Sequence, residues 1–132
     1  MKDKDILNRL FVENNLTNED VFKHQHYTII TRSGIEKIQA NLEIYCAYEV
    51  IKCEPNFAVV KAKGEITDEK FIQTFGSALK GKSYTDGNTN SWYVIEMAEK
   101  RAMSRAVLKL AGFYELGVFS EDESEQFKRS NN

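Results

Sequence analysis

The segment GSALKGKS (Gly76–Ser83) matches the P-loop pattern of a glycine, four residues and then Gly-Lys-Ser. A P-loop holds nucleotide phosphates because a helix begins at its Lys-Ser pair and offers backbone amides to them. Here the turn-forming run YTDGNTN follows Ser83, so the next helix is expected about eight residues too late. The strands around the motif are also expected to be antiparallel, whereas a P-loop fold needs parallel strands. We therefore predict no nucleotide site, and Lys80 and Lys82 remain as flexible cations.

The cysteines and histidines form no catalytic or metal-binding set. Cys46 and Cys53 lie in one expected strand, roughly 23 Å apart at about 3.3 Å per residue, and parity places them on opposite faces. We interpret both as reduced, semi-buried apolar residues. His24 and His26 have no cysteine or carboxylate cluster at zinc-ligand spacing beside them. The chain is expected to be a binding module without metal or cofactor, and not an enzyme.

Composition indicates one globular domain with an uneven distribution of charge. Of the 132 residues, 42% are apolar and 29% charged, with no apolar run of membrane-spanning length and no apolar leader in MKDKDILNRL. A cytoplasmic location follows as an expectation. Residues 61–109 carry nine basic and six acidic side chains, and residues 110–132 carry two and five. This asymmetry points to an anionic partner, although ordinary solvated faces would also produce it. We divide the chain into a domain at 1–119 and an acidic flexible tail at 120–132.

The residue pattern of the N-terminal part predicts short helices on either side of one strand. Asp3 or Asp5 can cap an amphipathic helix with the apolar side ILxxLF, and YTIIT (27–31) is typical of a short strand. Ser33 is the expected N-cap of the next helix, GIEKIQANL, with Glu36 closing a capping box.

A sheet and a long helix follow. Strands are expected at 44–53, 57–66 and 70–78, joined by short turns and therefore antiparallel neighbours. Ala58, Ala62 and Gly64 share the face that a helix covers, whereas Lys61 and Lys63 share the other. After a loop at 80–90, a helix capped by Ser91 runs to about Ala111 and stops at Gly112. The fold class is α+β: an antiparallel three- to four-stranded meander, a long helix packed on one face and short N-terminal helices.

The long helix carries two stripes. At 100° per residue, Ala98, Ala102 and Ala106 fall on the apolar side with Trp92, which is expected to anchor the core. Arg101, Arg105 and Lys109 form a neighbouring stripe, expected to be exposed. They can contact an anionic partner, or pair with Glu96, Glu99 and nearby acids.

The order of these elements resembles the single-strand annealing proteins related to the eukaryotic Rad annealing mediator, including phage-encoded single-stranded DNA-binding relatives. The resemblance covers roughly residues 27–117: GIEKI ahead of the meander, then the helix AEKRAMSRAVLKLAG. Where the family has an adjacent Lys-Arg before its Ala-Leu, Ser104 stands before Arg105 here, and the pair Lys100-Arg101 lies one turn earlier. The resemblance implies self-association, a role in phage or mobile-element replication or recombination, and the bacterial host cytoplasm as location.

Single-strand binding without sequence preference needs a cationic track and aromatic faces for bases. Tyr84 is the best stacking candidate in the loop. The predicted contacts are Lys61, Lys63, Lys80, Lys82, Tyr84, Lys100, Arg101, Arg105 and Lys109. The acidic tail can recruit replication or recombination proteins, compete for the groove, or only aid solubility. Two other functions stay open: a reader of duplex or double-stranded RNA shape, and a structural phage protein without nucleic-acid binding.

Overall fold

A three-stranded antiparallel sheet occupies the middle of the chain, in a computed structural model that describes residues 3–82 and 86–123. Its strands are β3 (Tyr45–Glu54), β4 (Phe57–Thr67) and β5 (Lys70–Leu79), in the order β3-β4-β5. These bounds lie within one residue of the predicted ones. Small residues alternate with lysines along β4, and this alternation gives the sheet one buried face and one open face.

The helix α3 (Val94–Ala111) packs across the buried face of this sheet. Ala98, Ala102 and Ala106 are fully buried, as their spacing predicts, and they let the helix approach β4 and β5 closely. A Cβ added to Gly76 of β5 would collide with the backbone of α3 at Ala98 and Ala102. Gly112, at φ 87°, ends the helix as expected.

The start of α3 differs from the prediction. The helix begins at Val94 with Tyr93 as its N-cap, and the Ser91 hydroxyl accepts a 3.1 Å hydrogen bond from the Tyr93 amide in the turn before the helix. Trp92 therefore lies ahead of the apolar stripe and is 75% exposed, so its assignment to the core is wrong.

The N-terminal part forms a second layer around a small sheet. It contains α1 (Asp3–Glu13), β1 (Val21–His24), β2 (Tyr27–Ile30) and α2 (Arg32–Leu42). The predicted helices and the YTIIT strand are present, but Thr31, rather than Ser33, caps α2 by accepting from the Gly34 amide. β6 (Val118–Ser120) pairs in parallel with β2, which makes a sheet of order β1-β2-β6 that was not predicted from the sequence.

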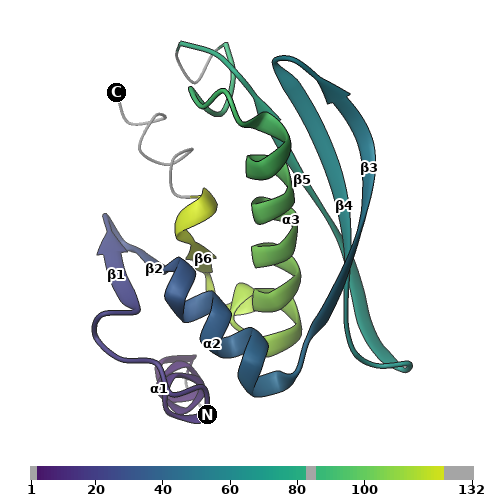
Figure 1. Cartoon of the computed structure of the whole chain (residues 1–132). Coiled ribbons are helices and arrows are strands. Elements are labelled where there is room, and N and C mark those ends of the chain that lie inside the picture. The colour runs from purple at the N-terminus through teal and green to yellow at the C-terminus, as the bar shows by residue number, and fades with distance from the viewer. Residues whose placement is uncertain (1–2, 83–85, 124–132) are drawn as a thin grey trace.

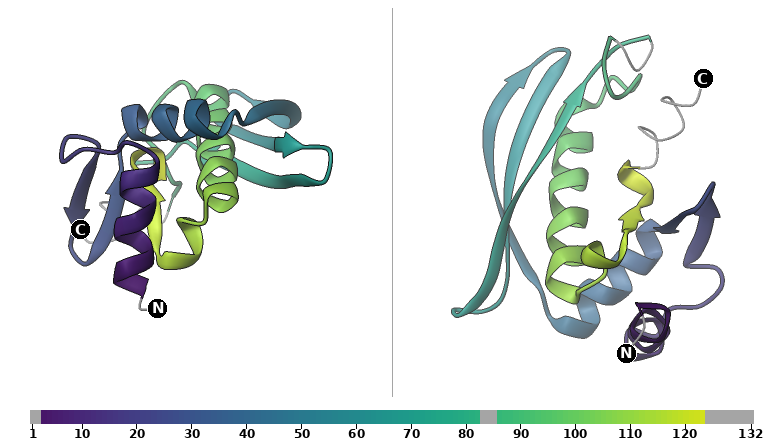
Figure 2. Two further views of the ribbon diagram at one scale, coloured as in Figure 1. Left: turned by 90° about the horizontal axis from the view of Figure 1, so that it is seen from below. Right: turned by 180° about the vertical axis from the view of Figure 1, so that it is seen from behind.

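α3 is the central element of the molecule. Figures 1 and 2 show it between the β3-β4-β5 sheet on one side and α2 and β6 on the other. The apolar core accordingly has two parts. The first lies under the sheet, and the second joins α2, β2 and β6 to the far side of α3. The fold is α+β, as predicted. Within the described residues, no helix combines the length and the apolar character that crossing a bilayer requires.

The domain extends beyond its predicted boundary at residue 119. Ser120 is a fully buried residue of β6, and residues 121–123 are helical. Asp122 and Glu123 are also buried, because arginines of α2 and α3 bind their side chains. These acids therefore belong to the fold rather than to a flexible tail. The rest of the predicted tail, 124–132, lies outside the described residues.

Candidate nucleic-acid interface

The first four residues of the GSALKGKS segment, 76–79, belong to the strand β5. Gly76 lies in the middle of β5, opposite Val60 of the antiparallel neighbour β4, and not in a loop between a strand and a helix. The next helix begins at Val94. Among the described residues, no helix N-terminus therefore lies beside Lys82 in the way that a P-loop requires.

Arg101 is a buried structural residue, and its assignment as an exposed nucleic-acid contact is wrong. Its side chain is 1% exposed. The guanidinium donates to three main-chain oxygens: Asp122 at 3.0 Å, Ser77 at 2.9 Å and Asn88 at 3.0 Å. Arginine has five donors in a planar fork, so it can satisfy carbonyls of three separate segments at once. The helix spacing correctly placed Arg101 beside the alanine stripe, but the C-terminal segment covers it.

The predicted helix stripe does not form one exposed track. Arg105 forms a 3.2 Å ion pair with buried Glu123 and donates to the Phe75 carbonyl. Burial opposes the charge on Arg105, but Glu123 outweighs it and raises the arginine pKa. Lys109 stands 5.1 Å above the Tyr114 ring. Lys100 is half-buried and lies on the side of α3 turned away from the sheet.

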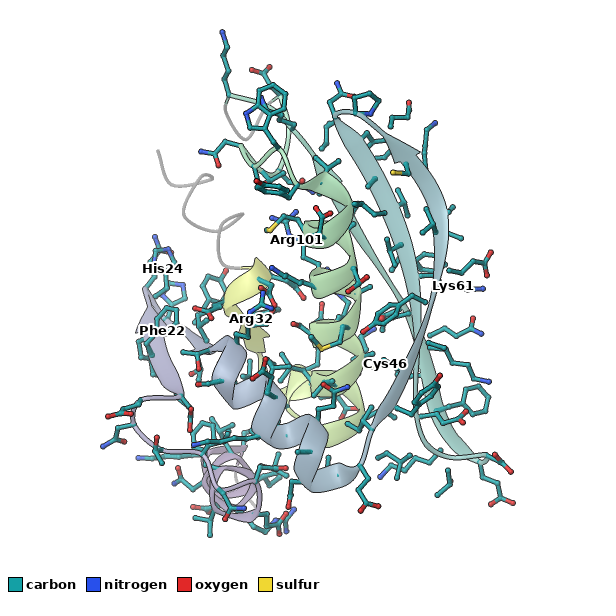
Figure 3. The ribbon with its side chains drawn as sticks, viewed as in Figure 1. Phe22, His24, Arg32, Cys46, Lys61 and Arg101 are labelled. Carbon is teal, nitrogen blue, oxygen red and sulfur yellow. The ribbon has the colours of Figure 1, made fainter. Side chains whose placement is uncertain are left out.

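Lys61 and Lys63 lie on the opposite side of the sheet from α3, as parity predicts. Figure 3 shows Lys61 and Arg101 separated by the sheet. A single groove joining the outward lysines to the helix cations is therefore excluded. We call the surface around these lysines the outer face; it consists of Tyr45, Ala47, Glu49, Lys52, Glu54, Phe57, Val59, Lys61, Lys63, Glu65, Phe71, Gln73, Phe75, Ser77 and Leu79.

The outer face contains a shallow hollow of about 260 Å³. It forms where Ala47, Lys63 and Gln73 stand side by side on the three strands, because the small alanine lies next to longer side chains. Lys61 and Glu49 line the next row of the hollow. Two lysine ammonium groups thus border one depression, which suits an anionic group such as a phosphate.

Exposed aromatic rings that were not predicted from the sequence flank the hollow. Phe71 and Phe75 are 49% and 51% exposed, and Tyr45 lies at the same end as Phe71. The Lys63 ammonium is 4.7 Å from the centre of the Phe71 ring. The signal was present in β5, where Phe71, Gln73 and Phe75 alternate with residues of the buried face.

A second group of cations and aromatic rings continues from the end of β5; we call Lys80, Lys82, Trp92 and Tyr93 the loop-end patch. The Lys80 ammonium lies 3.9 Å from the centre of the Trp92 ring. Lys82 and Tyr93 are exposed. Lys80 directly follows Leu79 of the outer face, so the two surfaces are continuous along the chain. Tyr84, the predicted stacking residue, lies outside the described residues.

The outer face is balanced in charge. Lys61 and Glu49 are 3.2 Å apart, Lys63 and Glu65 are 3.8 Å apart, and Lys52 pairs with Glu54 at 3.5 Å. Exposed pairs of this kind contribute only about 0–1 kcal/mol. A phosphate can therefore replace a carboxylate beside either lysine of the hollow at little cost.

The two cysteines share a face, contrary to the prediction. A β-bulge between Val50 and Lys52 shifts the alternation of β3, so Cys46 and Cys53 stand opposite Gly64 and Ala58 on the side of α3. Both are free thiols, and burial raises the pKa of Cys46. In the described part of the chain, no group of three or more His, Cys, Asp or Glu is arranged to hold a metal ion.

Comparison with known proteins gives no relative. No protein-family model matches the chain, and neither a curated protein nor a solved structure shows significant similarity to it. The function must therefore be argued from the surfaces described above.

Proposed function

We propose that the outer face and the loop-end patch bind single-stranded nucleic acid, DNA in the first place, with little sequence preference. The observation that carries the proposal is the Lys63–Phe71 pair, a cation within 4.7 Å of an exposed ring at the edge of a two-lysine hollow. Single-strand binders combine cations for phosphates with aromatic faces on which bases stack. Antiparallel sheets are known platforms for this kind of stacking.

The arrangement supports a path along β5. Phe71 and Phe75 stand on either side of Gln73, and Lys63 and Lys61 stand opposite Gln73 and Phe75 on β4. Bases stacked on the rings would leave phosphates beside the lysines. At the end of β5 the path reaches Lys80 and Trp92 of the loop-end patch.

The biological role that fits such binding is the coating or annealing of single strands during phage or mobile-element replication or recombination, without catalysis. Self-association and contacts with other replication or recombination proteins belong to the same proposal. This role requires a cytoplasmic location, because single-stranded DNA arises there during replication and recombination of the phage or mobile element.

A binding titration with three ligands tests the proposal. We expect fluorescence anisotropy of labelled single-stranded DNA to rise at protein concentrations that leave duplex DNA and double-stranded RNA unbound. Preference for either duplex would support the duplex-reading alternative. If no polynucleotide binds at low salt, the proposal is wrong and a structural role remains.

Substitution of the exposed phenylalanines tests whether the outer face is the surface that binds the single strand. Stacking contributes about 1–3 kcal/mol per base, so Phe71→Ala or Phe75→Ala should weaken binding by at least about fivefold. Both rings are half exposed, and the fold should persist. Val12→Ala is the matched control, because Val12 is an exposed apolar residue of α1. Equal affinity of the phenylalanine variants and the control would exclude the outer face as the binding surface.

A further inference from the structure

The two edges of the β3-β4-β5 sheet differ in whether their outward main-chain groups have hydrogen-bond partners. On β5, the outward main-chain groups are occupied by side chains and by the following loop. Arg105 donates to the Phe75 oxygen, and Arg101 and Asn88 donate to the Ser77 oxygen. The Leu79 amide donates to Asn88, and its oxygen accepts from the loop amides 88 and 89. The Phe75–Leu79 half of this edge is therefore closed to another strand.

The β3 edge is open by contrast. β3 has ten residues, and among the described elements it pairs only with β4. α3 lies over β4 and β5 and makes little contact with β3, as Figure 2 also shows. Tyr48, Val50 and Ile51 are consequently 43%, 56% and 49% exposed. A ten-residue edge with exposed apolar side chains and no strand partner on its outer side among the described elements is a site where another strand can add.

We propose that two copies of the chain pair through their β3 edges, antiparallel and about a two-fold axis, with Glu49 opposite Lys52 of the second copy. Each dimer then contains this pair twice. The result is a continuous six-stranded sheet, with both copies of α3 on the same side. A second copy is the occupant that the residues favour, because β3 is complementary to itself.

The β-bulge at Ile51 makes this register consistent. Residues directly opposite each other must point to the same face of the sheet. Glu49 and Lys52 both belong to the outer face, while Tyr48 and Cys53 both belong to the face of α3. The proposed register matches Tyr48 with Cys53 of the second copy, and their backbone groups both point away from β4. In this register, Val50 of each copy lies opposite Ile51 of the other copy, next to the two-fold axis.

The neighbouring symmetric registers are less favourable. A shift of two residues in one direction places Glu49 opposite Glu54 of the second copy, and like charges in this position are destabilising. The shift in the other direction places Lys52 opposite Ala47 and gives up the charge pair. That second register also brings Cys46 opposite Cys53, which provides a way to detect it.

Measurement of mass in solution tests the pairing. Sedimentation should give twice the 15.2 kDa of one chain. Lys52→Glu should yield monomers, because it creates two Glu–Glu pairs, whereas the double variant Glu49→Lys with Lys52→Glu should restore the dimer. Lys70→Glu, the same change at an exposed site on β5, should leave the dimer intact. A monomeric wild-type chain, or a Lys52→Glu chain that remains dimeric, would overturn the proposal.

Disulfide trapping tests the register independently of these charges. Cα atoms of a hydrogen-bonded antiparallel pair are about 5.5 Å apart, which is within disulfide range. With diamide as the oxidant, Tyr48→Cys should be cross-linked to Cys53 of the second copy, whereas Ala47→Cys, which points to the other face, should not. Cross-linking of the wild-type chain through Cys46 and Cys53 would show the shifted register instead. Neither assay contains nucleic acid, so their outcomes are separate from that of the binding titration.

Discussion

Arg101 Nε donates a 3.0 Å hydrogen bond to the main-chain oxygen of Asp122, and both residues are buried. The same guanidinium reaches the oxygens of Ser77 and Asn88, so one side chain of α3 holds the edge of β5, the following loop and the C-terminal segment. The Asp122 carboxylate in turn accepts from Ser104 at 2.8 Å and from Arg32 at 3.0 Å. The basic residues of the helix therefore connect segments that are distant in sequence.

Arg101→Ala should destabilise the protein by about 3 kcal/mol or more. The substitution removes one buried and two partly buried hydrogen bonds to main-chain oxygens, and the loss of a partner at a buried oxygen costs about 1–3 kcal/mol. Urea unfolding followed by circular dichroism measures the effect. Lys100→Ala, one position away but half-buried and pointing from the sheet, should change stability by no more than about 0.5 kcal/mol. Equal stability of the two variants would contradict the structural role of Arg101.

Ala102→Leu should lower stability by about 1–3 kcal/mol, because larger side chains in a closely packed core force strain. Ala102 is completely buried: its exposed fraction is 0%, and it packs in the cluster with Ala58 and Ala62 of β4. Thermal unfolding measures the change. Ala40→Leu, on the exposed side of α2, is the matched control and should leave the melting temperature nearly unchanged.

The meander and its helix could be predicted from sequence because their signals are local. Alternation in β4 and the four-residue spacing of Ala98, Ala102 and Ala106 each specify one face. β6 could not be predicted in this way. It has three residues and pairs in parallel with β2, so its formation depends on contacts across most of the chain. The bulge in β3, which moves Cys53 to the other face of the sheet, likewise could not be predicted from the alternation of apolar and polar residues.

The candidate site was predicted only in part, for a related reason. Lys61 and Lys63 follow from strand parity, which is intrinsic to β4. Whether Arg101 is exposed depends on which segment covers α3. The covering segment contains Asp122 and Glu123, which were interpreted as part of a flexible tail. Charge alone does not distinguish an acidic segment that stays in solvent from one that binds buried arginines. Asp122 and Glu123 differ from an ordinary tail because they follow the strand VFS after a single residue, Glu121.

Asp20 should make stability sensitive to acid. Burial opposes its ionisation, but hydrogen bonds from Lys37, Thr17 and Ser33 outweigh this and lower its pKa from 3.8 to about 2. The folded state thus binds a proton less readily than the unfolded state. The resulting stabilisation, on the order of 1–2 kcal/mol after solvent screening at exposed Lys37, is complete above pH 3.8 and is lost as the pH falls toward 2.

Comparison of Asp20→Asn with the wild type isolates the contribution of the Asp20 charge to stability. Urea unfolding at a series of pH values should show that Asp20→Asn is less stable than the wild type at neutral pH and that the difference shrinks below pH 3.8. Asp68→Asn, at an exposed turn between β4 and β5, should follow the wild-type profile. A constant difference between Asp20→Asn and the wild type across the acid range would show that the carboxylate charge is not the cause.

The salt dependence of single-strand binding should identify the phosphate contacts. Each phosphate contact to a single strand contributes about 0.7 to the slope of log affinity against log salt concentration. The double variant Lys61→Ala with Lys63→Ala should therefore reduce the slope by about 1.4 and weaken binding to all sequences alike. The control is Lys4→Ala with Lys23→Ala, which removes two exposed lysines from α1 and β1. Anisotropy titrations at several salt concentrations give the slopes. Equal reductions in the two double variants would mean that net charge alone drives binding, and the hollow on the outer face would lose its assignment.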